Sequence, residues 1–221
     1  MPLLYTFGQY TVAPMVKLAW RPVVEGLENI PTHGGAVLAG NHLSVADEYV
    51  LGAVVPRHIA FWAKSEYFTG TGLSGWAMRS LLTGLGAIPV NREGGRAALT
   101  ALDAAIPALQ GGDLVGVYPE GTRSPDGKLY RGRTGAVRLA ILAGVPIVPV
   151  GVVGTEKVQP IGKKIPKLGI KVEIKFGKPM DLSGQSMDSS TLRAITDELM
   201  SEIQKMTGQE YVPRYAPRRE S

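Results

Sequence analysis

Short apolar runs alternate with segments of helical periodicity along most of the chain, and this order restricts the fold more than any other feature. The apolar runs lie at 36–39, 59–63, 87–90, 114–118, 147–153 and 170–176. Helical patterns lie between them at 45–55, 75–82, 96–109 and 135–142. A last helix is predicted from Leu192, Ile195, Leu199, Ile203 and Met206, whose spacing forms one apolar face. The order predicts one α/β domain with a largely parallel central sheet flanked by helices.

Composition removes several classes of site. The chain of 221 residues can bury one substantial core, and no linker-like stretch divides it. The absence of cysteine excludes disulfides, thiolate nucleophiles and cysteine-based zinc sites. The three histidines, His33, His42 and His58, lack the spacing of metal ligands, so we expect no metal site. The formal net charge of +5 favours an anionic partner, which could be nucleic acid, a phosphorylated metabolite or an acidic membrane face.

The N-terminal segment, 1–22, is apolar and rich in aromatic residues, with Lys17 and Arg21 as its charged residues and Pro14 predicted to kink it. Such a segment suits a membrane interface, and packing on the domain's own core is the alternative. No window approaches the ~20 uninterrupted apolar residues of a spanning helix, and no signal-peptide pattern is present. We therefore expect an interface segment at 1–22, the main domain at 23–211 and a basic tail at 212–221.

Asn41, His42 and Asp47 directly follow the first apolar run. Because five residues of helix turn the direction by about 140°, His42 and Asp47 cannot share one helical face. They are expected to meet across a corner, with His42 in a loop and a helix opening near Ser44 through a capping box. Such a corner aims an imidazole into a cleft while the carboxylate fixes its tautomer, as a general base requires. The alternative role for Asp47 is to stabilise the helix N-terminus alone.

Two further segments place charged side chains after predicted strands. In the first, 86–92, the strand ends in Arg92. In the second, 117–124, the strand runs into Glu120, Gly121, Thr122 and Arg123. Because ligands bind at the carboxyl ends of parallel strands, we expect both segments to lie beside His42. Two guanidinium groups and a glycine turn that admits backbone N–H groups indicate a phosphate clamp.

Together these residues resemble the 1-acyl-sn-glycerol-3-phosphate acyltransferase family, the lysophosphatidic acid acyltransferases among the glycerolipid acyltransferases. Four ordered blocks carry the resemblance: N-H-x-x-x-x-D at 41–47, a proline-containing strand ending in arginine at 86–92, x-P-E-G-T-R-S at 118–124, and a proline-containing apolar strand at 145–150. Lys64 lies in a further stretch that is similar to many members. The resemblance runs from about 24 to 176, and four blocks in this order are highly specific.

The resemblance implies the transfer of a fatty acyl group from a thioester donor, acyl-CoA or acyl carrier protein, to the free hydroxyl of lysophosphatidic acid. The product would be phosphatidic acid, in phospholipid biosynthesis. The resemblance also implies that His42 is the general base, that Asp47 orients it, and that no acyl-enzyme forms. Backbone N–H groups near the helix after His42 are expected to hold the oxyanion. The residues implied to bind substrate are Asn41, Lys64, Arg92, Glu120, Gly121, Thr122 and Arg123.

The implied partners are the phosphorylated glycerolipid acceptor, the acyl thioester donor and a membrane surface. No cofactor is implied besides the donor, which is a co-substrate, and no nucleic acid is implied. The protein would be peripheral, on the cytoplasmic face of the cell membrane. His42 is the only histidine for which we expect a base-plus-carboxylate arrangement.

Some alternative functions are compatible with these residues and others are not. Related acylations remain open, with glycerol-3-phosphate, another lysophospholipid, or another amphipathic alcohol or amine as acceptor. A P-loop is excluded because the gap from Gly121 to Lys128 is one residue too long and Leu129 replaces the hydroxyl ligand of Mg²⁺. Scattered arginines disfavour a nucleic-acid-binding module. The presence of both His42 and Asp47 disfavours a non-catalytic lipid-binding relative.

Overall fold

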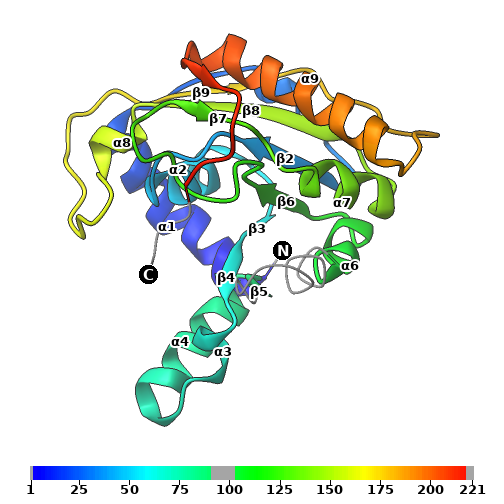
Figure 1. The fold of residues 1–221 in the computed structure, drawn as a ribbon. Coiled ribbons are helices and arrows are strands. Elements are labelled where there is room, and N and C mark those ends of the chain that lie inside the picture. Colours follow the sequence, from blue (N-terminus) through cyan, green and yellow to red (C-terminus); the bar gives the residue numbers. More distant parts are fainter. Residues whose placement is uncertain (1, 91–102, 218–221) are drawn as a thin grey trace.

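The structure, a computed structural model, describes residues 2–90 and 103–217. Its centre is a six-stranded sheet in the order β1-β9-β8-β2-β6-β3 (Figure 1). These strands are β1 (Val23–Glu25), β2 (Ala36–Gly40), β3 (Ile59–Ala60), β6 (Leu114–Val117), β8 (Ile147–Val153) and β9 (Glu173–Phe176). Neighbours pair in parallel except β8 and β9, which are antiparallel. The prediction of an α/β domain with a largely parallel sheet is confirmed.

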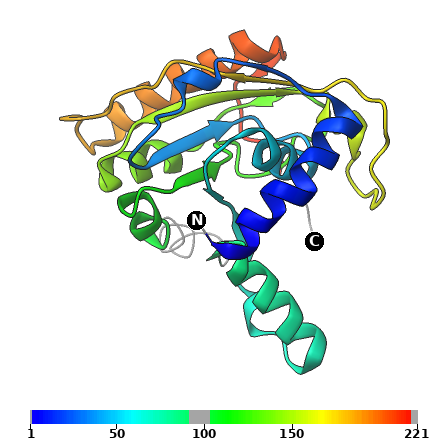
Figure 2. The same ribbon diagram turned by 180° about the vertical axis from the view of Figure 1, so that it is seen from behind.

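Helices cover both faces of this sheet (Figures 1 and 2). The helices α1 (Leu3–Trp20) and α2 (Ala46–Val54) pack on one face, and α6 (Ile106–Gln110), α7 (Gly135–Ala143) and α9 (Ser189–Thr207) on the other. Because successive residues of a strand face opposite sides, Leu38 of β2 joins the first core while Val37 and Ala39 join the second. Strands buried on both faces explain why the apolar runs are continuous rather than alternating.

The last helix, α9, follows its sequence pattern closely. It begins after Asp188, whose side chain accepts a hydrogen bond of 2.8 Å from the Thr191 backbone N–H. It ends at Gly208, which adopts a left-handed φ of 69°. The predicted apolar face lies against α7 and the sheet, where Leu199 and Ile203 are fully buried.

Two small parallel pairs lie outside the central sheet: β4 (Trp62–Lys64) with β5 (Ile88–Val90), and β10 (Tyr211–Val212) with β7 (Leu129–Tyr130). The strand predicted at 59–63 is therefore divided at Phe61 into β3 and β4. The 86–92 segment contains β5, which pairs with β4 and does not join the central sheet, and this differs from the prediction. The remaining helices of the described residues are η1 (Leu27–Asn29), α3 (Glu66–Thr69), α4 (Gly72–Gly84) and α8 (Thr155–Val158).

The N-terminal segment is a single helix, α1, and Pro14 lies inside it without ending it. One face of α1 packs on α2 and buries Ala13, Val16 and Trp20. The opposite face is exposed and apolar. Within the described part of the chain, no helix has both the length and the apolarity needed to cross a bilayer. The predicted helix at 96–109 is described only from 103 onward, and its last turn is α6.

Candidate active site

A strand-to-helix corner places the first block. β2 ends at Gly40, and α2 begins at Ala46. Asp47 Oδ2 accepts a 2.9 Å hydrogen bond from the Ser44 backbone N–H, while Ser44 Oγ accepts a 3.1 Å bond from the Ala46 N–H. These two contacts close the first turn, and they differ from a capping box in that the serine oxygen accepts from Ala46 N–H instead of Asp47 N–H. His42 therefore lies in the loop before the helix, as the spacing requires.

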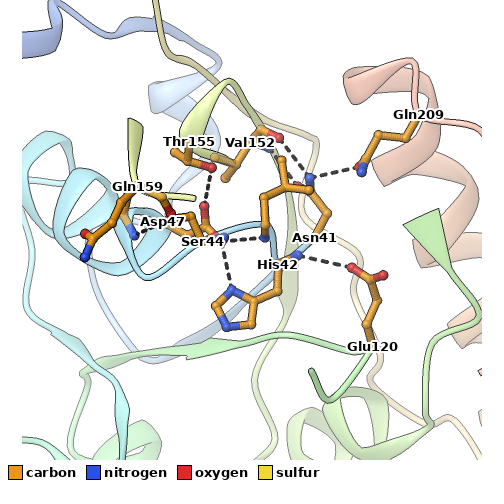
Figure 3. Close-up of polar contacts among 11 residues, drawn as sticks. Asn41, His42, Ser44, Asp47, Glu120, Val152, Thr155, Gln159 and Gln209 are labelled. Atoms are coloured by element: carbon orange, nitrogen blue, oxygen red, sulfur yellow. Dashed lines mark hydrogen bonds and ion pairs between the residues drawn. The ribbon is translucent and has the colours of Figure 1, made fainter. Parts of the chain in front are cut away.

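The corner brings His42 and Asp47 together (Figure 3). His42 Nδ1 lies 2.8 Å from Asp47 Oδ2, which also accepts a 2.8 Å bond from the Leu43 N–H. The other oxygen, Oδ1, accepts a hydrogen bond from Thr155 Oγ1. Asp47 is fully buried, whereas the His42 side chain is 14% exposed. An ionised Asp47 accepts the proton of Nδ1, so the lone pair of the neutral imidazole lies on Nε2, on the opposite side of the ring.

Residues of the third block contact the ring and the backbone of the same histidine. The Tyr118 ring is stacked on the imidazole, with ring centroids 3.8 Å apart and planes 9° apart. The His42 N–H donates to Glu120 Oε1 at 3.1 Å, and the Ser124 N–H donates to the His42 carbonyl at 2.7 Å. Burial raises the pKa of the Tyr118 phenol well above its ordinary value of 10, so the stacked ring stays neutral. The ring and backbone of His42 are thus both fixed.

Glu120 is 1% exposed. Its second oxygen, Oε2, accepts a 2.9 Å hydrogen bond from the Tyr130 N–H. Burial raises the pKa of this carboxyl to about 7, against the opposing effect of its two backbone donors at Tyr130 and His42. The carboxyl therefore ties the third block to the His42 loop and to β7.

Asn41 extends the pairing of β2 with β8 by its side chain. Its Oδ1 accepts a 2.8 Å bond from the Val152 N–H, and its Nδ2 donates 2.8 Å to the Val152 carbonyl. Nδ2 also donates 2.9 Å to Gln209 Oε1. Asn41 is fully buried, and it fixes the direction in which the chain leaves β2 toward His42.

The other residues predicted to bind substrate belong either to the loop of the third block or to the segments around β4 and β5. Gly121 has a φ of 74°, and a side chain there would bring its Cβ within 3.2 Å of Arg133 Nε. Thr122 and Arg123 are half-buried in the same loop. Lys64 ends β4, and its side chain lies outside the described part of the structure, as does Arg92. The structure thus joins the first and third blocks.

Sequence reasoning missed Thr155 and Tyr118 as parts of this site. Thr155 is fully buried and follows the end of β8, the strand of the fourth block. The rule that ligands and functional groups gather at strand carboxyl ends would have identified it. Tyr118 had no such signal, because it occupies the variable position of its block. Among the backbone N–H groups that follow His42, those of Leu43 and Ser44 donate to Asp47 and are not available to an oxyanion.

A second histidine–carboxylate pair was not expected. His58 Nδ1 lies 3.1 Å from Asp113 Oδ1, so His42 is not the only histidine with a carboxylate neighbour. However, His58 is buried, its Nε2 lies 3.0 Å from the Leu85 carbonyl, and the Tyr5 ring packs edge-on against it. Both ring nitrogens of His58 face protein groups. His58 therefore links α1 and β3 to the residues before β5 and presents no nitrogen to a substrate.

The chemical capacity of the site is that of an oriented base. His42 presents one imidazole nitrogen away from a buried carboxylate, and Arg123 lies in the adjoining loop. Over residues 2–90 and 103–217, no group of three or more His, Asp or Glu side chains could hold a metal ion.

Sequence comparison adds the decisive observation. Residues 21–153 match the profile of the Acyltransferase family, and this range includes all four blocks. The chain belongs to the Acyltransferase family. It is 29% identical to the 1-acyl-sn-glycerol-3-phosphate acyltransferase of Bacillus subtilis over 92% of this chain and 96% of that protein. It is 35% identical to a chloroplastic 1-acyl-sn-glycerol-3-phosphate acyltransferase of Arabidopsis thaliana over 64% of this chain.

The fold has a solved counterpart. The crystal structure of the 1-acyl-sn-glycerophosphate acyltransferase PlsC from Thermotoga maritima superposes with a TM-score of 0.70 and 28% identity, covering 91% of this chain and 80% of that one. The match spans 38% of the length of the Arabidopsis relative and 40% of that of a Brassica napus relative.

Proposed function

We propose that this protein transfers a fatty acyl group from acyl-CoA or acyl carrier protein to the free hydroxyl of lysophosphatidic acid, forming phosphatidic acid. The observation that carries the proposal is the His42–Asp47 pair, 2.8 Å apart, within the region that matches the Acyltransferase family. The names of the relatives from Bacillus subtilis and Thermotoga maritima support the same acceptor.

In the proposed mechanism His42 Nε2 removes the proton of the acceptor hydroxyl as its oxygen attacks the thioester carbonyl. Asp47 stabilises the imidazolium that forms. The tetrahedral intermediate then collapses with cleavage of the carbon–sulfur bond, and the thiolate leaves. The proton held by His42 neutralises the thiolate or passes to solvent. No covalent enzyme intermediate is needed, and the sequence has no G-x-S-x-G turn that would present a serine nucleophile.

Acceptor binding is assigned mainly to the third block. Gly121 and Thr122 would contact the glycerol part, and Arg123 would bind the phosphate together with Arg92, because a guanidinium matches phosphate oxygens in a fork. Lys64 would neutralise charge on acceptor or donor. Glu120 would act on the acceptor through the loop that it holds, since both of its oxygens already accept backbone hydrogen bonds.

The proposed location is peripheral, on the cytoplasmic face of the cell membrane. The exposed face of α1 supports it, because the large side chains there are apolar or aromatic: Leu3, Leu4, Phe7, Tyr10, Val12, Met15 and Leu18. Lys17 and Arg21 add attraction to anionic lipid of about 1 kcal/mol per well-placed charge.

The decisive experiment offers purified protein each positional isomer of lysophosphatidic acid, and glycerol-3-phosphate in parallel, with long-chain acyl-CoA or acyl carrier protein. Mass spectrometry identifies the product. Phosphatidic acid from either lysophosphatidic acid isomer, absent with the His42→Ala protein, is the expected result. Acylation of glycerol-3-phosphate alone would assign the earlier acylation step instead.

A further inference from the structure

An arm formed by α3 and α4 projects from the body of the protein (Figures 1 and 2). The parallel β4–β5 pair closes its base, with Trp62 opposite Ile88. The two helices meet closely at their turn, where a Cβ on Gly75 would lie 2.2 Å from the Gly70 carbonyl carbon. The arm is therefore a packed helical hairpin whose closest helix–helix contact requires glycine.

The arm presents apolar side chains outward. Neither α3 nor α4 contains a buried residue. Leu73 is 81% exposed and Trp76 is 57% exposed, and the other large exposed side chains are Tyr67, Met78 and Leu81. Between 65 and 85, the charged residues are Glu66 and Arg79. The surfaces of monomeric soluble proteins rarely carry this many large apolar side chains close together unless a partner binds there.

This surface is continuous with the exposed face of α1. The N-terminal part of α1 packs on the end of α4, where a Cβ on Gly84 would lie 3.1 Å from Leu4 Cδ2. The exposed Leu3 and Phe7 on α1 therefore adjoin the arm. Tyrosine and tryptophan favour the bilayer interface, and Tyr67 and Trp76 place one of each on the arm.

We propose that the α3–α4 arm is a second lipid-docking element, which inserts its apolar side chains into the same bilayer surface as α1. The inference rests on the proposed function, because an enzyme whose acceptor and product are lipids must work at a bilayer. Two separate apolar elements hold the protein in a defined orientation on the bilayer. Contact through α1 alone would let the whole protein rotate about the axis of that helix. The His42 site is thereby kept at a fixed height above the lipid.

The first test uses Trp76 as a native probe. The protein is mixed with vesicles of phosphatidylcholine and phosphatidic acid in which the phosphatidylcholine carries bromine on its acyl chains. Trp20 and Trp62 donate their indole N–H groups to the carbonyls of Lys167 and Gly116, inside the body of the protein. We expect strong quenching in the native protein and the loss of most of it in Trp76→Phe. Equal quenching of the two vesicle-bound proteins would overturn the docking of the arm.

The second test compares Leu73→Ser/Leu81→Ser with Leu142→Ser, which changes an exposed leucine of α7 on the other side of the sheet. Vesicle binding should fall roughly tenfold or more in the arm variant, because removing one leucine side chain from water is itself worth about a factor of ten. Turnover of acceptor in vesicles should fall in parallel. Turnover of a short-chain lysophosphatidic acid below its micelle concentration should be unchanged, which shows that the site is intact.

The outcomes separate the docking from the proposed function. A native protein that acylates no lysophosphatidic acid contradicts the function, while bromine quenching still reports on the arm. A second copy of this chain is the other partner that could cover the apolar surface of the arm. Light scattering after gel filtration tests for it. A native dimer that becomes a monomer in Leu73→Ser/Leu81→Ser, with vesicle binding unaltered, would assign the surface to self-association and overturn the proposal.

Discussion

Thr155 Oγ1 donates a hydrogen bond to Asp47 Oδ1, the carboxylate oxygen that does not contact His42. The two residues are 108 positions apart, and both are fully buried. Asp47 is therefore oriented by the end of β8 as well as by its own helix. The orientation of the histidine depends on packing between the first and fourth blocks.

Thr155→Val keeps the shape of the side chain but removes this donor. A hydrogen bond to a charged group is worth about 1.5–3 kcal/mol, so we expect kcat to fall about ten- to hundredfold while KM for both substrates stays nearly constant. Thr155→Ser retains the hydroxyl and should recover most of the activity. Steady-state kinetics on the three proteins measures the split. A Thr155→Val protein that is merely less stable, with native kcat, would limit Thr155 to a structural role.

His42→Ala tests the base directly. Loss of a general base is typically worth a factor of ~10²–10⁴, and we expect turnover to fall by that order with the fold intact by circular dichroism. Asp47→Asn should also lose a large part of the activity, because an amide nitrogen would face the His42 or backbone donors. Folded His42→Ala protein with near-native turnover would falsify the assignment.

Arg123→Ala tests the phosphate clamp. The expected result is a higher KM for the acceptor or a lower kcat/KM, with a smaller effect on the acyl donor, because the clamp is proposed to bind the phosphate of the acceptor. Arg123→Lys should recover part of the loss, since an ammonium lacks the planar fork. The same pair of changes at Arg92 serves as the parallel test. If both alanine proteins bind acceptor as the native protein does, the clamp lies elsewhere.

The sequence predicts those parts of the fold that rest on local pattern. The apolar run at 147–153 coincides with β8, and the periodic residues of α9 form its buried face. Pairing is harder to predict, because which edge a strand joins depends on contacts between distant residues. The sequence therefore did not reveal the antiparallel β8–β9 pair or the departure of β4 and β5 from the central sheet.

In the candidate active site, too, contacts between residues close in sequence could be predicted, and contacts between distant residues could not. The His42–Asp47 contact joins residues only five positions apart across a strand-to-helix corner, so local sequence is enough to predict it. Glu120 could be recognised as part of the site, but not as a buried carboxyl bound to two backbone N–H groups, because its partners, His42 and Tyr130, belong to separate strands and loops. The stacking of Tyr118 on the imidazole likewise depends on the parallel pairing of β2 with β6.

The raised pKa of Glu120 predicts a pH dependence of stability. Because the pKa of about 7 in the folded state exceeds the ordinary 4.5, the folded protein holds a proton that the unfolded chain has released between these pH values. This stability is fully present below pH 4.5 and is lost as the pH rises through 7. At about 1.4 kcal/mol per pKa unit, it is on the order of 3 kcal/mol.

Glu120→Gln removes this titration and serves as the control. Urea unfolding at pH 5, 6, 7 and 8 should show that the native protein loses stability with rising pH relative to the glutamine variant. The variant itself should be less stable at pH 5, because its amide nitrogen faces a backbone N–H at His42 or Tyr130. Parallel pH profiles for the two proteins would contradict the raised pKa.

The exposed face of α1 is best tested by substitution, because α1 cannot be removed without opening the core. Its buried Val16 and Trp20 pack with α2, and Gln9 donates to the Gly52 carbonyl at 2.5 Å. Phe7→Ser/Met15→Ser changes only the outer face. Vesicle flotation should show native binding that grows with anionic lipid and falls with salt, and a severalfold weaker binding of the variant at equal charge. Equal flotation of both proteins would mean that the outer face of α1 does not touch lipid.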